Sequence, residues 1–187
     1  MKNMNPTRVT TGKDTRFSYL NVHEPKAVKD GDQPMFSASL IIPKTDVVTI
    51  NKINKGIEAA YKEGEAKLKG NGKTVPPMNS LRFLPLHDGD QERPEDDAYR
   101  NSYFINAKAR PDHKPKLFGP DGEEIVDSSD FYSGIYGKAI IQFYCYNHGG
   151  NKGIATSLLG LKKIRDGEPL GGATVTADDF DDDDFLD

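Results

Sequence analysis

The stretch FYSGIYGKAIIQFYCYN, residues 131–147, spaces aromatic rings and uncharged polar groups in a way that suits the binding of flat ligands. Successive side chains of a β-strand point to opposite faces, so every second residue shares a face. One face is apolar or small and is expected to lie on the core: Ile135, Gly137, Ala139, Ile141, Phe143 and Cys145. The other combines tyrosines with a lysine and an amide and is expected to be exposed: Tyr136, Lys138, Ile140, Gln142, Tyr144 and Tyr146.

Residues 99–110 divide in the same way. The side expected to be buried carries Tyr99, Asn101, Tyr103, Ile105, Ala107 and Ala109. The other side is basic and carries one ring: Arg100, Ser102, Phe104, Asn106, Lys108 and Arg110. If the two strands are neighbours in a sheet, their polar faces merge into one surface of rings and cations.

Such a surface suits single-stranded nucleic acid. Unpaired bases expose apolar π-faces that stack on Tyr and Phe, while Arg and Lys bind the phosphates and release counterions. Stacking contributes roughly 1–3 kcal/mol per base whatever the sequence, whereas a duplex hides its base faces. The predicted DNA-binding residues are therefore Arg100, Phe104, Lys108, Arg110, Tyr136, Lys138, Tyr144 and Tyr146.

The same pattern has a purely structural interpretation. Tyrosine is common on strands because it fits a half-buried pleated surface, and a second layer or a homodimer interface could cover the rings. The cations at Lys108, Arg110, Lys114 and Lys116 could likewise form an ordinary solvated face. The alternative is thus a structural or interaction protein whose aromatic face is a subunit interface.

Enzyme chemistry has less support. The segment HDGD at 87–90, with His113 and His148 elsewhere, offers metal-ligand types and would suit a metal-dependent nuclease, but no spaced motif such as H-E-x-x-H is present. A G-x-S-x-G motif is also missing, and the single cysteine, Cys145, falls on the predicted core face as an inert thiol. Neither catalysis nor a metal or other cofactor is expected.

The elements that position these residues are mostly strands. Alternation predicts strands near residues 16–22 and 36–42 with a turn at Asp30-Gly31 between them. Apolar residues then recur at helical spacing from Ile50 to Leu68, which predicts one helix of about 20 residues capped by Thr45 or Asp46.

The rest of the chain continues this pattern. Residues 71–97 are expected to be loop with one short strand near LRFLPL. Turns are expected at residues 120–122 and at NHGGNKG, and a last strand at IATSLLGLKKI. Six or seven strands with one helix indicate a small β-barrel or sandwich.

Charge is distributed unevenly along the 187 residues. Seven of the 29 acidic residues lie between Asp178 and Asp187, and the other 22 stand against 25 basic residues, which leaves residues 1–177 with a net charge of +3. A basic body joined to an acidic end is typical of proteins that bind nucleic acid. With one cysteine, no apolar leader and no run of roughly 18 apolar residues, we expect a protein without membrane contact in a reducing cytoplasm.

The expected domains are residues 1–172 and a disordered acidic tail at 173–187. Two phenylalanines interrupt the carboxylates, as anchors for a hydrophobic pocket would. The predicted partner-binding residues are Asp178, Asp179, Phe180, Asp181, Asp182, Asp183, Asp184 and Phe185. A tethered polyanion can also compete with DNA phosphates for a basic groove, so we expect the tail both to shield the groove and to recruit partners.

Three segments carry a resemblance to a known family. They are SYLNVHEPK (18–26), FSASLIIPK (36–44) and YSGIYGKAIIQFYCYNHGGNKGIATSLLGLKKIRDGEPLGG (132–172). With them, the chain resembles the single-stranded-DNA-binding proteins encoded by bacteriophages and prophages, which have an OB-fold core and an acidic tail. The chain departs from related tails, which often end in an aromatic residue, because Leu186 and Asp187 follow Phe185.

The resemblance implies a mostly-β fold with one helix, an OB-fold-like Greek-key barrel with extra strands and loops. It also implies a replication or recombination accessory protein that coats single strands, removes hairpins and acts in the bacterial host cytoplasm. The tail would contact phage or host replication and recombination proteins. No base-contacting residue is taken from the family; the residues named above come from the strand faces.

Overall fold

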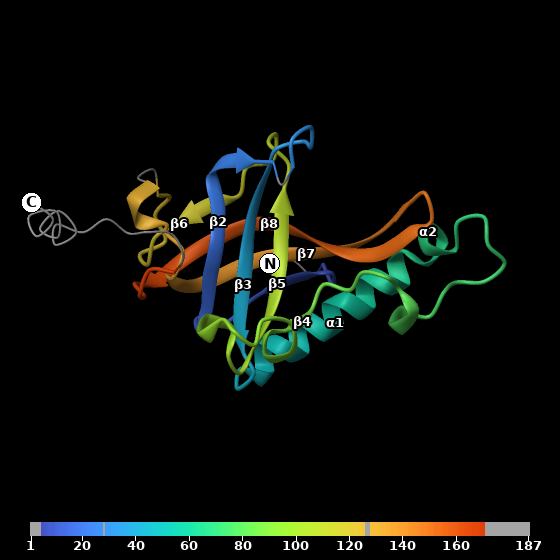
Figure 1. Ribbon diagram of the computed structural model, residues 1–187, viewed down its shortest axis with the longest axis horizontal. Helices are drawn as coiled ribbons and strands as arrows, with labels where there is room; N and C mark the ends of the chain where they lie inside the picture. Colours follow the sequence, from blue (N-terminus) through green and yellow to red (C-terminus); the bar gives the residue numbers. More distant parts are fainter. Residues whose placement is uncertain (1–4, 28, 126–127, 171–187) are drawn as a thin grey trace, which may run out of the picture.

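Strands are the main secondary structure of this computed structural model, which describes residues 5–27, 29–125 and 128–170 (Figure 1). The strands are β1 Arg8–Thr10, β2 Thr15–Lys26, β3 Met35–Pro43, β4 His87–Asp88, β5 Ser102–Ala109, β6 Lys116–Phe118, β7 Tyr136–His148 and β8 Asn151–Arg165. The helices are α1 Val47–Glu63, α2 Glu65–Lys69 and α3 Gly89–Glu92, with 3₁₀ turns η1 Met78–Ser80, η2 Asp97–Tyr99 and η3 Ser128–Asp130. The expected acidic tail lies outside the described residues.

Five of the strands close into a ring. β2 pairs with β3, β3 with β5 and β7 with both β8 and β2, all antiparallel, whereas β5 pairs with β8 in parallel. The short strands β1, β6 and β4 add to β7, β8 and β5 at the outside of the ring. The mostly-β fold is confirmed, and five strands in a ring is also the strand number of an OB fold. The described residues contain eight strands, one or two more than the pattern predicts, because β1 and β4 are too short to show alternation.

The expected turns are present where glycine allows a left-handed backbone. Gly149 and Gly150, with φ of 59° and 89°, join β7 to β8, and Gly31, with φ of 92°, lies between β2 and β3. Gly122 has φ of 84° in the turn after β6, where the backbone N–H of Gly119 donates to the carbonyl oxygen of Glu123 at 2.8 Å. The β7–β8 hairpin extends past the other strands toward α2 (Figure 1).

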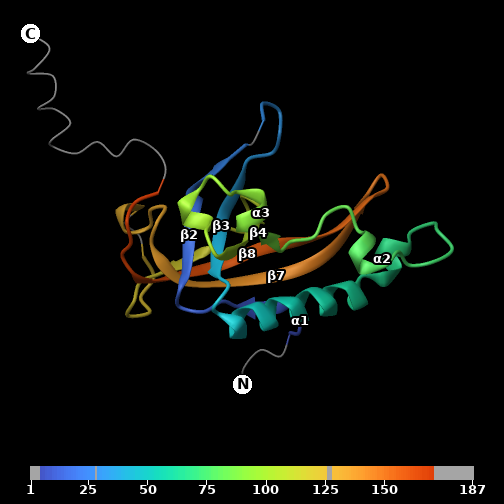
Figure 2. The same ribbon diagram turned by 60° about the horizontal axis from the view of Figure 1, so that its bottom comes forward.

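The single long helix is also confirmed, at α1, and it runs along β7 (Figure 2). It begins after Asp46, whose carboxylate accepts hydrogen bonds from the backbone N–H of Thr49 at 3.2 Å and from its hydroxyl at 2.6 Å. Ile53 and Ile57 face the core as the helical spacing predicts. The helix packs closely on the sheet, because a Cβ at Gly56 would lie 3.0 Å from the ring of Phe143.

The two faces predicted for the opening stretch are confirmed on β7. Gly137, Ala139, Ile141, Phe143 and Cys145 are buried, whereas Lys138, Ile140 and Tyr144 are exposed. Tyr136, Gln142 and Tyr146 are partly exposed. The Cys145 thiol donates to the carbonyl oxygen of Ala60 at 3.1 Å, and burial raises its pKa, so the sulfur stays a protonated packing group. Among the described residues, none of the helices is both long enough and apolar enough to pass through a membrane.

The cap of α1 provides a stability prediction. Asp46→Ala should lower the free energy of unfolding by about 1 kcal/mol, because the first turn of α1 loses the acceptor for its backbone N–H. Glu58→Ala is the matched control, since Glu58 is exposed in the middle of the same helix, and it should change stability by less than about 0.5 kcal/mol. Urea unfolding of the two variants measures both values, and equal stability would contradict the capping role.

Candidate nucleic-acid interface

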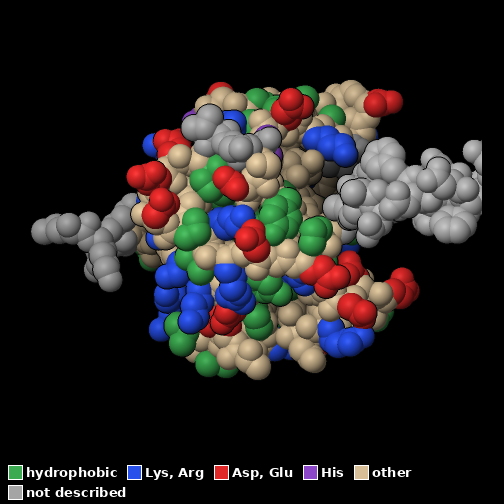
Figure 3. All heavy atoms as spheres, turned by 90° about the vertical axis from the view of Figure 1, so that its left-hand side faces the viewer, with side chains coloured by type: hydrophobic (Ala, Val, Ile, Leu, Met, Phe, Trp, Pro, Cys, Tyr) green, Lys and Arg blue, Asp and Glu red, His purple; other side chains and the backbone are tan. Residues whose placement is uncertain are grey.

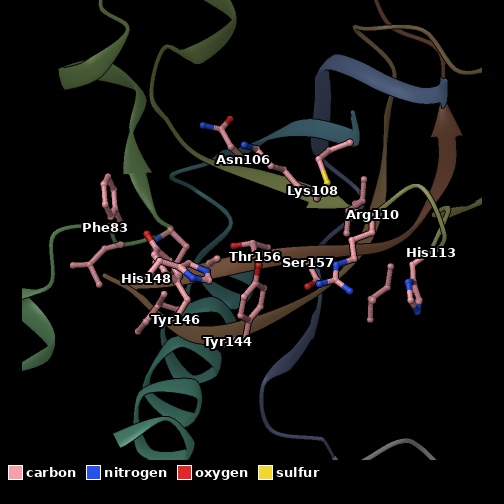
Figure 4. Close-up of a pocket in the computed structure, with 18 of the residues that line it drawn as sticks. Phe83, Asn106, Lys108, Arg110, His113, Tyr144, Tyr146, His148, Thr156 and Ser157 are labelled. Atoms are coloured by element: carbon pink, nitrogen blue, oxygen red, sulfur yellow. The ribbon is translucent and has the colours of Figure 1, made fainter. Parts of the chain in front are cut away.

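A groove of about 1070 Å³ crosses the outer surface of β5, β8 and β7 (Figure 4). Residues 82–85 and His87 form its rim on one side, and residues 113–116 lie at the other end. Figure 4 shows Phe83, Tyr146 and His148 gathered on one side and Arg110 and His113 on the other, with Tyr144 between them. The groove therefore has an aromatic end and a basic end.

Small residues on β8 keep this groove open. Gly153 pairs with Tyr146, Ala155 with Tyr144 and Ser157 with Gln142, so the outward positions of β8 are small wherever its partner on β7 carries a larger side chain. Because directly opposed residues in an antiparallel pair share a face, the tyrosines stand above a shallow floor. The alternation of glycine, alanine and serine in β8 thus creates the hollow.

The aromatic end combines residues of β7 with one loop residue. Tyr144 is 47% exposed and Phe83 44% exposed, so both rings are open to solvent. The ring of Tyr146 lies 6.2 Å from Phe83 and 5.7 Å from His148, measured between ring centroids. Partial burial raises the pKa of the Tyr146 phenol, so this ring is neutral at physiological pH. Several rings with accessible faces follow one another along the hairpin.

Phe83 was not among the predicted site residues, and its position depends on Gly153. The carbonyl oxygen of Phe83 accepts from the backbone N–H of Ile154 at 3.0 Å, and a Cβ at Gly153 would lie 2.7 Å from that same oxygen. The guanidinium of Arg82 lies 5.1 Å from the Phe83 ring and donates to Asn151 at 2.9 Å. The sequence shows the Arg82-Phe83 pair, but it does not show that this segment lies against β8.

The basic end comes from β5 and the segment that follows it. Lys108 pairs with Ser157 of β8, which places its side chain beside the hairpin, and Arg110 lies two residues further along the same face. Five basic side chains line the groove: Arg82, Lys108, Arg110, Lys114 and Lys116. Among the described residues that line it, there is no aspartate or glutamate. The local charge is therefore positive even though the whole chain carries −4.

The merging of the two polar faces occurs, but not by the expected adjacency. The merged surface was predicted on condition that β5 and β7 are neighbours in a sheet, but β8 lies between them. The merged surface forms nonetheless because β8 carries small outward residues. Of the eight predicted DNA-binding residues, the groove brings together Lys108, Arg110, Tyr144 and Tyr146.

The predicted exposure of Phe104 is wrong. Phe104 is 3% exposed and belongs to a small second cluster with Ile41 and Tyr99 on the outside of the sheet. The alternation fails because the acidic segment after residue 86 folds back over β5, where β4 pairs His87 with Phe104. The His87 imidazole stacks on the Phe104 ring at 5.0 Å, so the protein itself occupies the face that was expected to bind a base.

The segment that folds back over β5 also changes where this strand begins. Tyr99, predicted on the core side of a strand from residue 99, instead lies in η2 and packs edge-on against Phe104 at 5.0 Å. β5 begins only at Ser102, because Asn101 has φ of 52° and reverses the chain. Arg100 lies in this turn, with its side chain exposed and paired with Asp97, outside the groove.

Tyr136 and Lys138 lie far from the groove. Eight residues of extended strand, about 26 Å at 3.3 Å per residue, separate Tyr136 from Tyr144. The Tyr136 ring is covered by guanidinium groups, with Arg16 at 5.2 Å and Arg165 at 4.1 Å from its centroid. The end of the molecule that carries β2 and β6 shows basic and acidic side chains together (Figure 3). This end has a mixed charge, unlike the groove.

Residues 87–90, which carry the candidate metal-ligand types, take part in ion pairs within the fold. Lys44 pairs with Asp88 at 2.9 Å and with Asp90 at 2.8 Å, and His87 contacts Glu92 at 2.9 Å. The two carboxylates raise the pKa of Lys44, mainly by accepting its hydrogen bonds. The ion pairs of Lys44 hold residues 87–92, which cover β5, against the end of β3. Within the described ranges, no three side chains of His, Cys, Asp or Glu are grouped so that they could hold a metal ion.

Known proteins share both the sequence pattern and this fold. Residues 7–187 match the family model described as "Enterobacter phage Enc34, ssDNA-binding protein". The "Putative protein p50" of Acyrthosiphon pisum secondary endosymbiont phage 1 is 30% identical over an alignment of 182 positions, and the match covers 90% of this chain and 90% of the relative.

Two solved structures are similar over nearly the whole chain. The single-stranded DNA-binding protein of bacteriophage Enc34, solved in complex with ssDNA, superposes with a TM-score of 0.72 at 25% identity and covers 89% of this chain and 91% of its own. The single-stranded DNA-binding protein gp2.5 of bacteriophage T7 has the same fold, with a TM-score of 0.59 at 15% identity and coverage of 94% and 93%. The family match spans nearly the whole chain, and the chain therefore belongs to the Enc34 phage single-stranded-DNA-binding protein family.

Proposed function

We propose that this protein binds single-stranded DNA without regard to sequence and acts in phage DNA replication and recombination, in the cytoplasm of the bacterial host. The observation that carries the proposal is the groove, whose aromatic end faces a basic end with no described carboxylate between them. A family relative with a TM-score of 0.72 was solved in complex with ssDNA, which supports the same ligand here.

The arrangement fits a single strand better than a duplex. Tyr144, Tyr146 and Phe83 present ring faces on which unpaired bases stack, and a duplex offers such faces only at its ends. Lys108 and Arg110 stand on the opposite side, where the phosphates of a strand with stacked bases would run. The role is binding, because the groove offers rings on which bases stack and cations that hold phosphates, and the matching family is one of ssDNA-binding proteins.

The C-terminal residues have a second role in the proposal. The seven carboxylates after residue 177 are linked to the same chain as the groove, so their effective concentration there is high. They would compete with DNA for Lys108, Arg110 and their neighbours, and once displaced they would present Phe180 and Phe185 to replication or recombination proteins. A homodimer that covers the groove is the competing interpretation, and DNA binding by the exposed rings would exclude it.

Fluorescence anisotropy with labelled oligo(dT) and with duplex DNA tests this function. The protein should bind oligo(dT) much more tightly than the duplex, and Tyr144→Ala should weaken oligo(dT) binding by roughly 5- to 100-fold, because one stacked base is lost. Ile140→Ala is the matched control: Ile140 lies on the same face of β7, is 38% exposed and does not line the groove, so this variant should bind as the wild type does.

Two outcomes would contradict the proposal. Equal affinity for duplex and oligo(dT) would show that the rings do not stack on bases. A wild type that binds neither would favour the subunit-interface interpretation, and size-exclusion chromatography would then reveal a dimer that Tyr144→Ala weakens.

The basic wall predicts a change in salt dependence. Lys108→Gln should reduce the slope of log K against log salt by about 1, because one phosphate contact and its released counterion are lost. Lys138→Gln removes the same charge from an exposed position on β7 outside the groove and should leave the slope unchanged. If Lys108→Gln and Lys138→Gln had the same salt slope, the DNA phosphates would not run along β5.

The tail predicts a gain of affinity on truncation. Deleting residues 178–187 should tighten oligo(dT) binding at low salt, and the gain should shrink as salt rises, because screening weakens the competing carboxylates. Replacing the seven aspartates by asparagine keeps the length and should reproduce the gain. If neither variant changes the affinity, the shielding role is wrong.

A further inference from the structure

A second, smaller hollow adjoins the groove on the outer face of the sheet. It measures about 320 Å³, and residues of β2, β3 and β5 line it together with Arg93. Asn106 and Lys108 line both hollows. In Figure 4 they stand on β5 at the edge of the groove. A chain lying in the groove could therefore pass over these two residues into the smaller hollow.

An exposed tyrosine with an unusual backbone stands at the far side of this hollow. Tyr19 is 57% exposed and has φ of 46°, in the left-handed region that residues other than glycine seldom adopt. It lies where the β2–β3 register shifts between Ser18 and Asn21. Bulges of this kind change the direction of a side chain, and strained backbone is concentrated at functional sites. The strained backbone keeps a large ring in solvent on an otherwise regular strand.

Neighbouring residues hold this backbone in place. The backbone N–H of Leu20 donates to the Ser133 hydroxyl at 3.1 Å, and the carbonyl oxygen of Phe17 accepts from the N–H of Gly134 at 2.7 Å. The β2 bulge is thus fixed from the 133–134 turn. The exposure of Tyr19 is a built feature of the fold and not a frayed strand end.

Arg93 supplies a cation beside this ring. Its guanidinium lies 5.5 Å from the Tyr19 ring centroid, 4.9 Å from that of Tyr99 and 5.0 Å from that of Phe104. In the part of the chain that the structure describes, no carboxylate lies within ion-pair distance of Arg93. Three rings hold the guanidinium in position while its charge is uncompensated, which suits the binding of a phosphate.

We infer that the single-stranded DNA track continues from the groove across Asn106 and Lys108 into the smaller hollow, where a base stacks on Tyr19 and Arg93 binds the adjoining phosphate. This inference rests on the proposed function. Phe104 lies between the two hollows and is covered by His87 and Arg93. The DNA strand therefore passes beside this ring, over the exposed residues of β5. Lys108 serves both hollows as the shared phosphate contact.

A length series of oligo(dT) tests the extended track. Oligonucleotides from about 4 to about 16 nucleotides, the range of OB-fold site sizes, should bind the wild type with affinity that rises until both hollows are filled. Tyr19→Ala should bind the shortest ones normally and the longest ones roughly 5- to 100-fold more weakly. Tyr19→Phe keeps the ring and should match the wild type at every length. Arg93→Gln should lower the salt slope by about 1 for the longest ones only.

A second readout uses the unaltered protein. Long oligo(dT) that carries a photoreactive 5-iodouracil near one end should crosslink to Tyr19, while the short ones should not. Crosslinks confined to the groove, or an affinity of Tyr19→Ala equal to that of the wild type at all lengths, would overturn the inference. The proposed function would survive that result as long as the wild type bound oligo(dT) more tightly than the duplex and Tyr144→Ala weakened that binding.

Discussion

The parallel pairing of β5 with β8 is the constraint on which the groove depends. It fixes Lys108 opposite Ser157, and the antiparallel β7–β8 pairing then fixes Ser157 opposite Gln142 and Ala155 opposite Tyr144. One set of registers therefore determines how far the cations stand from the rings. A shift of one residue in either pairing would turn the rings or the lysine to the core face, since side chains alternate along a strand.

The strand faces could be predicted where nothing covers the sheet, and they failed where the chain folds back on it. On β7 the alternation from Gly137 to Cys145 holds, because α1 packs on one side and the other is open. On β5 it holds from Ile105 onward and fails at Phe104, which lies under residues that resemble an ordinary acidic loop in the sequence. Local periodicity indicates that a residue points away from the core, but not whether a distant segment lies above it.

The site itself was predicted in part for the same reason. Lys108, Arg110, Tyr144 and Tyr146 could be found because each lies on a regular strand or directly after one. Phe83 could not, because its position depends on the missing side chain of Gly153 seventy residues later in the chain. Tyr19 was assigned to a strand, but its exposure follows from a bulge that the pattern does not reveal. Contacts between distant segments and departures from regular backbone geometry account for both omissions.

The bracing of the β7–β8 hairpin by the helices has a thermodynamic consequence. The Cys145 thiol is held by the carbonyl oxygen of Ala60, the Asn147 amide donates to the carbonyl oxygen of Lys67, and Gly64 leaves no room for a side chain against Cys145. These contacts hold the strand that carries Tyr144 and Tyr146 before any ligand arrives. The conformational entropy of that strand is lost during folding rather than during association, so the platform is preorganised. The helices on the opposite face thereby strengthen an interaction in which they take no direct part.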